Sequence, residues 1–271
     1  MEENQIELAF SKGIFVLNEI LDGISDYFSI NENHRLKRVF IFSTLASMRL
    51  SYEDQKTLIV DIMNQHSNKV FYLPAFTYNS RRFVPYRNDE PPSPQNGSLS
   101  RVVFQEGLHK GVRTLDEDYS YLILGNENRS EAEVSKESAW RSKSFGSNSH
   151  HEVLYSEPAV FFCIGNGLKD GFTPAMHFEA LENVEYRKYI EIPSQYMEGQ
   201  SKEYYAREEK LYQDFGKKGR EKLVGEFMNS DETGFRTYSL QGAPRLYAFT
   251  LAEFSEVVSK ALSTDKNFFL S

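Results

Sequence analysis

Among the histidines of the chain, His177 has the neighbours that proton-transfer chemistry needs. Thr173 lies four positions before it, and Glu179 and Glu182 lie two and five positions after it. A histidine held by a carboxylate is a common arrangement for taking a proton near pH 7, because the carboxylate orients the ring and stabilises its charged form. Spacing alone leaves a second interpretation open, a histidine that caps or packs near a strand end. The pattern predicts a general base with either glutamate as its partner.

Two apolar runs early in the chain end in hydroxyl side chains. RVFIFSTL ends shortly after Ser43 and Thr44, and KVFYLPAFTY ends shortly after Phe76 and Thr77. Such runs are typical of buried strands that end at a sheet edge. A loop rich in Pro, Asn and Ser follows and contains Ser93, and its hydroxyl and backbone N–H groups could hold an amide- or phosphate-bearing ligand. Any strand that runs into a loop offers similar groups, so this pattern alone identifies no ligand.

Other reactive side chains have simpler explanations. The adjacent residues His150 and His151 have no third ligand at a suitable spacing, and adjacent side chains point in different directions on a helix or a strand. We therefore expect them in a surface loop, with no metal site. Cys163 lies inside the apolar run AVFFCIG, which favours a buried, inert thiol over a nucleophile.

The net charge of −8 and the pI near 5.4 oppose general binding to nucleic acid or an anionic membrane, since those partners attract an excess of Lys and Arg. The cluster of Arg81, Arg82 and Arg87 could still receive phosphates through forked hydrogen bonds, or could simply be part of a solvated loop. A single cysteine excludes an internal disulfide and fits a reducing compartment. The N-terminus lacks a signal-peptide pattern, and no apolar run reaches the ~18 residues of a membrane span. We expect a soluble cytoplasmic protein.

The order of the elements predicts an α/β fold. Apolar periodicity indicates one or two helices between Ile6 and Tyr27, within a helical N-terminal segment, residues 1–35. A strand, a helix that begins at Ser51 and a second strand then suggest a βαβ unit. Further expected elements are a helix with a capping box at Ser130 and Glu133, a strand in SEPAVFFCIGNG, a helical stretch from Ser201 to Met228, and a helix opened by Thr250 and Glu253. We expect a single domain, residues 1–271, with a central mixed β-sheet flanked by helices.

A series of short motifs resembles, in order and spacing, the aminoglycoside 3-N-acetyltransferase family. FSTL (42–45) is similar to the family's His-Ser-Ser-Leu strand end, and LPAFTY to its Pro-Thr-Phe-Thr strand end. The other similar segments are Pro92-Ser93 with NGSL (96–99), Arg113-Thr114 with Ser120, FGSNS (145–149), FFCIGNGLKDGFTPAMHFE (161–179), VEYR (184–187) and GAPRLY (242–247). No single motif is specific, but their order and spacing favour this family from about Arg38 onward.

The resemblance implies an enzyme, a CoA-dependent N-acetyltransferase that moves acetyl from acetyl-CoA directly to an amine, with no acyl-enzyme and no metal. It gives His177 the role of general base, held by Glu179 or Glu182. Thr77, Thr173 or nearby backbone N–H groups would then stabilise the oxyanion. The residues expected along the acetyl-CoA path are Ser43, Thr44, Leu45, Phe76, Thr77, Ser93, Arg113 and Ser120.

Three departures from the family pattern concern the acceptor. Phe42 replaces a His, Arg101 replaces an acidic residue, and Asp116-Glu117 replaces His-Pro. Because Arg101 would repel a polycationic aminoglycoside, we expect an amino sugar with its own negative charge, such as a nucleotide-linked one, although an aminoglycoside-like acceptor and a role in antibiotic resistance stay open. Two alternatives remain: an acyl-CoA thioester hydrolase, and a catalytically degenerate protein that binds acetyl-CoA or a sugar. The aromatic excess leaves room for a homodimer interface.

Overall fold

Strands and helices follow one another along the chain much as its hydrophobic pattern predicts. The computed structural model describes residues 2–30, 35–45, 50–77, 87, 89–93, 98–125, 129–165, 168, 172–207, 218–229, 234–240 and 246–270. In chain order the elements are α1 (Glu2–Ser29), β1 (Arg38–Thr44), α2 (Tyr52–Gln65), β2 (Val70–Pro74), α4 (Ser98–Gln105), β3 (Tyr121–Leu124), α5 (Glu131–Glu137), α6 (His150–Leu154), β4 (Ala159–Gly165), α7 (Pro174–Leu181), β5 (Arg187–Pro193), β6 (Ser201–Arg207), α8 (Lys218–Asn229), β7 (Arg236–Tyr238), β8 (Leu246–Thr250) and α9 (Leu251–Thr264).

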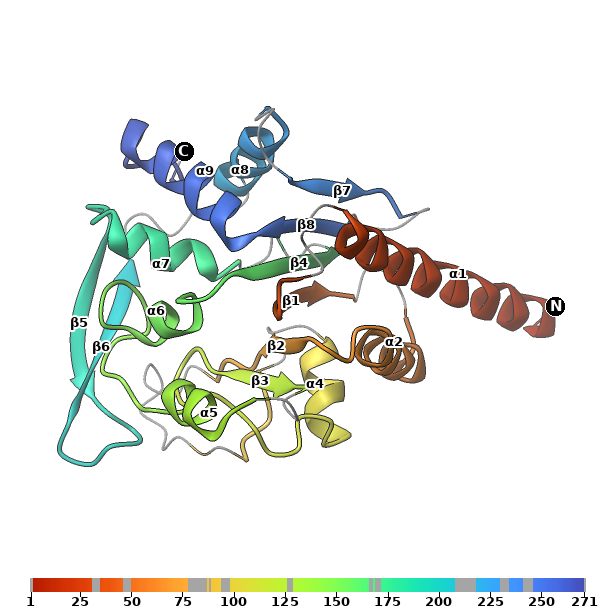
Figure 1. The fold of residues 1–271 in the computed structure, drawn as a ribbon, viewed down its shortest axis with the longest axis horizontal. Helices are drawn as coiled ribbons and strands as arrows, with labels where there is room; N and C mark the ends of the chain where they lie inside the picture. Colours follow the sequence, from red (N-terminus) through yellow and green to blue (C-terminus); the bar gives the residue numbers. More distant parts are fainter. Residues whose placement is uncertain are drawn as a thin grey trace.

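The main sheet is mixed, with the strand order β3-β2-β1-β4-β8-β7 (Figure 1). β1 lies near its centre and is parallel to both neighbours, with Val39 opposite Phe71 of β2 and Val160 of β4. The strands β3, β8 and β7 run antiparallel to the strands they join. The parallel pair β1 and β2 is connected through α2, so the predicted βαβ unit and the predicted α/β class with a mixed sheet are confirmed.

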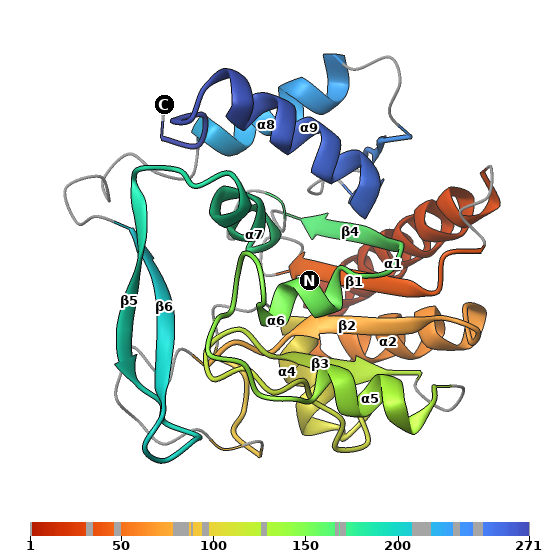
Figure 2. The ribbon, with the colours of Figure 1, turned by 60° about the vertical axis from the view of Figure 1, so that its left-hand side comes forward.

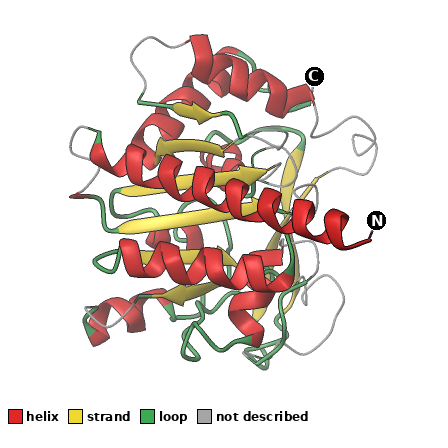
Figure 3. Ribbon diagram, turned by 90° about the vertical axis from the view of Figure 1, so that its right-hand side faces the viewer, coloured by secondary structure: helices red, strands yellow, loops and turns green. Residues whose placement is uncertain are grey.

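Side chains alternate along β1 and divide the core into two layers. Val39 and Ile41 belong to the layer with α1, α2 and α4, whereas Phe40 and Phe42 belong to the layer with α6, α7, α8 and α9. Figure 3 shows helices of the first layer lying across the strands, and Figure 2 shows α6 and α7 in front of the sheet with α8 and α9 above them. A sheet covered on both faces requires apolar residues in succession, which explains the unbroken run VFIF in β1.

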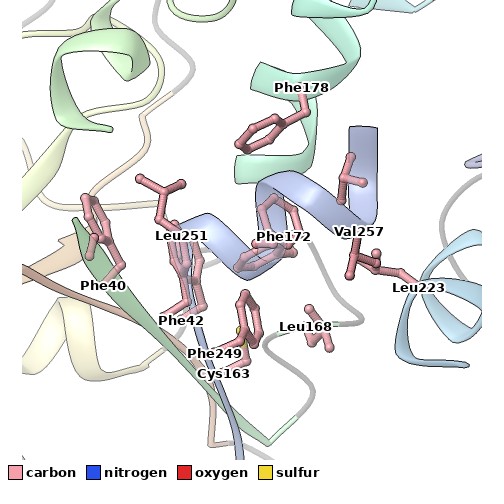
Figure 4. Close-up of a cluster of buried hydrophobic side chains, with 14 of the residues drawn as sticks. Phe40, Phe42, Cys163, Leu168, Phe172, Phe178, Leu223, Phe249, Leu251 and Val257 are labelled. Atoms are coloured by element: carbon pink, nitrogen blue, oxygen red, sulfur yellow. The ribbon is translucent and has the colours of Figure 1, made fainter. Parts of the chain in front are cut away.

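An aromatic cluster fills the space between the sheet and the helices α7 and α9 (Figure 4). Phe42 is 4% exposed, and its ring centroid lies 5.0 Å from that of Phe172. Phe161 and Phe249, on the paired strands β4 and β8, lie 5.6 Å apart by the same measure. Cys163 is buried in this cluster and burial raises the pKa of its thiol, which confirms the predicted buried thiol.

The helix starts follow capping signals in the sequence. Ser130 and Glu133 form the predicted capping box, in which the Ser130 hydroxyl accepts a hydrogen bond from the Glu133 N–H at 3.2 Å. Thr250 and Glu253 form the same arrangement at the start of α9. Ser51 caps α2 in the same way, as the sequence predicts. These caps satisfy backbone donors of the first turn and fix where each helix begins.

The predicted one or two N-terminal helices form a single helix, α1. Its buried residues Leu17, Ile20 and Ile24 recur at helical spacing and pack in the layer with α2. The N-terminal half of α1 projects beyond the sheet in Figure 1. Among the helices in the described ranges, none is both long enough and apolar enough to cross a membrane.

The segment from Ser201 to Met228 begins with a strand, so the prediction of a helical stretch there was wrong in its first part. β6 pairs antiparallel with β5, with Tyr205 opposite Tyr189, and the two strands form a hairpin beside the main sheet (Figure 2). The charges of this segment suggested an exposed helical face, but Lys202 is fully buried against Asp116 at 2.8 Å. This tertiary contact overrides local propensity, and helix follows only at α8.

The end of β4 yields a prediction about stability. Gly165 has φ +69°, and a Cβ there would lie 2.4 Å from the backbone oxygen of Thr44, an atom that cannot rotate away. We expect Gly165→Ala to lower the free energy of unfolding by roughly 2–4 kcal/mol. Gly225 in α8 has no atom within 4 Å of such a Cβ, so Gly225→Ala should leave stability unchanged or raise it by about 0.5–1 kcal/mol. Urea unfolding compares the two variants, and equal stabilities would contradict the expectation.

Candidate active site

His177 lies on α7 and faces a cavity on the same side of the sheet as this helix. Pro174 occupies the first turn of α7, where its missing N–H is not needed, and His177 follows one turn later. His177 is 4% exposed and lines a cavity of about 580 Å³. That volume lies within the range typical of small-molecule sites. Other side chains in its wall are Arg35, Tyr155, Glu157, Thr250 and Ser255.

The two ring nitrogens of His177 have different surroundings. The Gly146 N–H donates a hydrogen bond to Nδ1 at 3.3 Å. Nε2 has no hydrogen-bond partner among the described residues, and it is not enclosed by protein atoms. It is therefore the ring nitrogen that is accessible from the cavity. Burial, followed by the neighbouring His151, lowers the pKa of His177 to about 3, and the ring is therefore neutral at pH 7. Because a neutral imidazole carries one hydrogen, the bond from Gly146 assigns that hydrogen to Nε2.

Both predicted carboxylate partners of His177 have other partners. Glu179 is 1% exposed and forms an ion pair with Arg187 at 2.6 Å. Glu182 lies at the end of α7 and pairs with Lys266 at 3.0 Å. Residues two apart on a helix do not face each other, which explains why Glu179 points away from the imidazole. Within the described part of the chain, neither carboxylate hydrogen-bonds to His177, and the role of general base stays a prediction.

His150 and His151 are fully buried at the start of α6, so the prediction of a surface loop was wrong. His151 donates from Nδ1 to the Ser144 carbonyl at 2.7 Å, which leaves Nε2 to accept from the Tyr121 hydroxyl at 3.1 Å. The His150 Nε2 lies 3.0 Å from the Thr114 hydroxyl. Each ring has a buried polar neighbour, and burial is tolerated for that reason.

The sequence does contain a signal for α6. Ser149 precedes Glu152 by three positions, and its hydroxyl accepts a hydrogen bond from the Glu152 N–H at 3.1 Å. This spacing is typical of a helix start. A helix that begins at Ser149 has a buried side, and both histidines lie on it. The signal was outweighed by the polar, loop-like composition of SFGSNSHH.

At the end of β1 lie three of the residues expected on the acetyl-CoA path. Ser43 and Leu45 are buried, and Thr44 is partly exposed. The Thr44 hydroxyl oxygen is enclosed and has no hydrogen-bond partner among the described residues. The adjacent strand ends at Gly165, which leaves room for the Thr44 backbone. At the carboxyl ends of the two central parallel strands, the Thr44 hydroxyl is thus enclosed and has no partner among the described residues.

Three more of the predicted path residues lie beyond the end of β2. Phe76 and Thr77 are buried, and the Thr77 hydroxyl donates to the Glu117 carbonyl at 2.8 Å. The Ser93 N–H donates to the Phe76 carbonyl at 2.9 Å. The bond to Glu117 holds the loop after β2 against the segment before β3, and the bond from Ser93 joins two parts of that loop. The structure thus gathers the predicted hydroxyls at the carboxyl ends of β1 and β2, whereas the cavity that His177 lines lies beside the amino ends of β1 and β4, with Leu36 and Ala159 in its wall.

Arg113 and Ser120 bind backbone rather than presenting charge to an open site. Arg113 is 3% exposed, its Nε donates to the Ser120 hydroxyl at 2.8 Å, and its Nη1 donates to the Glu90 carbonyl at 2.6 Å. The second terminal nitrogen of Arg113 and the Ser120 hydroxyl both donate to the Ala75 carbonyl. The two side chains therefore fix the backbone from which Phe76 extends.

The residues that depart from the family pattern lie away from the cavity. Arg101 is exposed on α4, which covers the opposite face of the sheet from α7. Asp116 is buried in its ion pair with Lys202. Glu117 accepts from the Trp140 indole N–H at 3.1 Å and from the Gln195 N–H at 2.8 Å. Arg101, Asp116 and Glu117 were expected beside the acceptor, but none of them lines the cavity that contains His177.

The remaining ligand candidates are few. Arg87 is exposed and pairs with Asp89 at 2.7 Å, and Arg81 and Arg82 lie outside the described residues. Within the ranges that the structure describes, no three His, Cys, Asp or Glu side chains are grouped so as to hold a metal ion.

No protein-family model and no curated protein sequence matches this chain. Solved structures do match. The apoenzyme of aminoglycoside acetyltransferase AAC(3)-IVa has a TM-score of 0.67 and 13% identity over 87% of this chain and 85% of that chain. AAC(3)-Xa has a TM-score of 0.66 and 13% identity over 99% of each chain, and AAC-IIIb in a binary structure with CoASH has 0.62 and 16% over 84% and 90%. The chain therefore has the fold of these aminoglycoside acetyltransferases, as its motifs predict.

The buried histidines predict how stability depends on pH. Burial lowers the pKa of His150 to about 4 and that of His151 and His177 to about 3, whereas an unfolded histidine titrates near 6.5. As the pH falls below 6.5, the unfolded chain binds protons that the folded chain does not. The free energy of unfolding should then fall by up to about 1.4 kcal/mol per pH unit for each histidine. Urea unfolding between pH 6.5 and 4.5 measures this slope, and His150→Gln and His151→Gln should each make it shallower; an unchanged slope would contradict the assignment.

The buried ion pair yields a second prediction. Lys202→Met leaves the Asp116 carboxylate buried without its cation, and we expect the free energy of unfolding to fall by roughly 3–5 kcal/mol. The double variant Asp116→Asn/Lys202→Met removes both charges and should regain part of that loss. Denaturant titration of both variants and of Asp116→Asn completes the cycle. Losses that simply add would show that the two side chains do not interact.

Proposed function

We propose that this chain is an acetyl-CoA-dependent N-acetyltransferase that transfers acetyl directly to the amine of a small molecule. The observation that carries the proposal is a neutral imidazole, His177, on the wall of a cavity of small-molecule size. The shared fold supports it, since AAC-IIIb is described with CoASH and AAC(3)-IVa in complex with a gentamicin. The ordered motifs of the sequence support the same chemistry.

In this proposal acetyl-CoA lies at the carboxyl ends of the central parallel strands and its thioester extends over the sheet face toward α7, whereas the acceptor enters through the cavity beside the amino ends of β1 and β4. Thr44 contributes its unused hydroxyl at the strand end. Thr173 precedes α7 and follows Phe172, whose ring contacts Phe42 of β1. His177 lies four residues further, about 6 Å along the helix axis. The thioester is already activated, so positioning of the amine and control of its proton are sufficient for reaction.

The other predicted path residues shape this route. Phe76 and Thr77, which follow β2, line it, and Ser43, Leu45 and Ser93 support the strand ends. Arg113 and Ser120 act through the Ala75 carbonyl, which sets the direction of the loop after β2. An amide-rich pantetheine chain needs such fixed backbone groups for its hydrogen bonds.

We propose an amino sugar or a related small amine as the acceptor. Glu157 lines the cavity and its side chain is 49% exposed, although it pairs with Arg38 at 2.9 Å. Its carboxylate can therefore still accept hydrogen bonds from amino or hydroxyl groups of a sugar. A nucleotide-linked acceptor, which Arg101 led us to expect, carries phosphate groups. In the described wall of this cavity, Arg35 is the only arginine or lysine that could pair with them.

The direct test is His177→Ala. The variant should fold normally and lose acetyl transfer by about 10²-fold or more, because the side chain acts at the reacting atoms. The measurement is thiol release from acetyl-CoA in the presence of amino sugars, free and nucleotide-linked, and of aminoglycosides. His66→Ala is the matched control, since His66 packs beside Phe28 in the other layer of the core.

Three outcomes would contradict the proposal. Near-full activity of His177→Ala would show that His177 does not act in acetyl transfer. Thiol release that does not depend on an amine would indicate a thioester hydrolase instead. Calorimetry that detects no acetyl-CoA binding by the wild-type protein would favour a degenerate binding protein.

A further inference from the structure

We propose that His177 serves in acetyl transfer as a hydrogen-bond donor, with its Nε2–H directed at the thioester carbonyl oxygen, rather than as the base that accepts the amine proton. This inference rests on the proposed acetyltransferase function. It follows from how the chain fixes the opposite ring nitrogen.

The position of the Gly146 N–H is set by buried groups on both sides. The Ser144 carbonyl accepts hydrogen bonds from the His151 N–H at 3.1 Å and from the His151 Nδ1 at 2.7 Å. The Phe145 carbonyl accepts one from the Tyr189 hydroxyl at 2.9 Å. Gly146 has φ +74°, and a Cβ there would lie 2.6 Å from that same hydroxyl. The backbone donor that faces His177 is therefore held in place by its surroundings.

A backbone N–H can only donate, and this decides where the ring hydrogen of His177 lies. If the hydrogen were on Nδ1, two donors would face each other across 3.3 Å, and the buried Gly146 N–H would lose its acceptor. A histidine that accepts a proton at Nε2 needs its hydrogen on Nδ1, which in enzymes a carboxylate commonly holds there. Here Gly146 occupies the position of such a carboxylate, and Glu179 is engaged by Arg187.

The neighbours of His177 favour the neutral ring as well. The rings that pack against it are Tyr155 and Phe178, each with centroids 5.3 Å away, and His151, at 6.4 Å. His151 is neutral at pH 7, and burial raises the pKa of Tyr155, so neither contributes a negative charge. Within the described residues, no carboxylate forms a hydrogen bond or an ion pair with the imidazole. A neutral N–H donor in such surroundings is suited to a developing oxyanion.

The donor role gives a balanced reaction. The neutral amine attacks the thioester carbonyl carbon, and the C=O electron pair moves onto oxygen, where the Nε2–H of His177 receives it. The pair returns as the C–S bond breaks, and the CoA thiolate leaves. The proton of the amine ends on the departing sulfur, so the products are the amide and CoASH. His177 keeps its hydrogen throughout, and its neutral form is the working one.

The test compares two substitutions of the same residue. The Gln amide N–H of His177→Gln can donate from about the position of Nε2, but it has no basic nitrogen. We expect His177→Gln to stay within about tenfold of wild-type kcat, while His177→Ala falls by ~10²–10³-fold. Equal losses in the two variants would overturn the donor role. Circular dichroism and acetyl-CoA binding of both variants confirm that they are folded and loaded.

Nitrogen NMR of histidine-labelled wild-type protein gives a readout besides activity. The His177 signals, identified by their loss in His177→Gln, should show the hydrogen on Nε2 at pH 7. A hydrogen on Nδ1, together with wild-type acetyl transfer, would overturn only the donor role. Wild-type protein that releases no CoA with any amine would overturn the proposed function and the donor role with it.

Discussion

The carboxylate of Asp116 joins parts of the chain that lie far apart in sequence. It is fully buried and accepts hydrogen bonds from Lys202 Nζ at 2.8 Å, from the Ser144 hydroxyl at 2.9 Å, and from the N–H groups of Asp118 and Tyr119 at 2.9 and 2.8 Å. Burial by itself would raise the pKa of this carboxyl, but the charge of Lys202 and these hydrogen bonds outweigh it and hold the pKa below its ordinary value. A buried pair of this kind adds little net stability over an apolar pair, yet it is costly to separate. The pair of Asp116 and Lys202 therefore favours the arrangement in which the segments around residues 116, 144 and 202 pack together.

Those segments set the hydrogen-bond partner of His177. Lys202 fixes the hairpin of β5 and β6, and Tyr189 of the same hairpin holds the Phe145 carbonyl. Ser144 is held by hydrogen bonds to Asp116 and His151. The direction of the nearby Gly146 N–H is therefore fixed, and it donates to His177. The ring hydrogen of His177 is thus assigned by tertiary contacts and not by a partner on α7. A local rule about a histidine and its nearest glutamate cannot describe such a site.

Much of the fold follows from local signals in the sequence. The apolar runs of β1 and β4 predict strands buried on both faces, and the hydroxyl and carboxylate pairs at Ser130 and Thr250 mark helix starts correctly. Long-range pairings are different, because Lys202 and His151 lie in stretches whose composition is typical of solvent-exposed segments, and only partners distant in sequence show that they are buried.

The candidate site also has parts that the sequence predicts and parts that it does not. The hydroxyls at the strand ends were predictable from strand polarity, since parallel strands β1 and β2 must end at one edge. The partner of the imidazole was not predictable, because it is a backbone group with no sequence signature.

The motif departures take on a different meaning once the chain is folded. Phe42 fills the aromatic cluster beside Phe172, Asp116 is neutralised by Lys202, and Arg101 lies over the other face of the sheet. These positions therefore respond to packing and to internal charge balance, and a charge preference for the acceptor does not follow from them. Under the proposed function, the groups that can discriminate between acceptors are those in the cavity wall, where Glu157 shares Arg38 with the buried Glu137. Because Arg38 is divided between two carboxylates, Glu157 keeps hydrogen-bonding capacity toward the cavity, and a hydrogen-bond donor on the acceptor is favoured there over an anionic group.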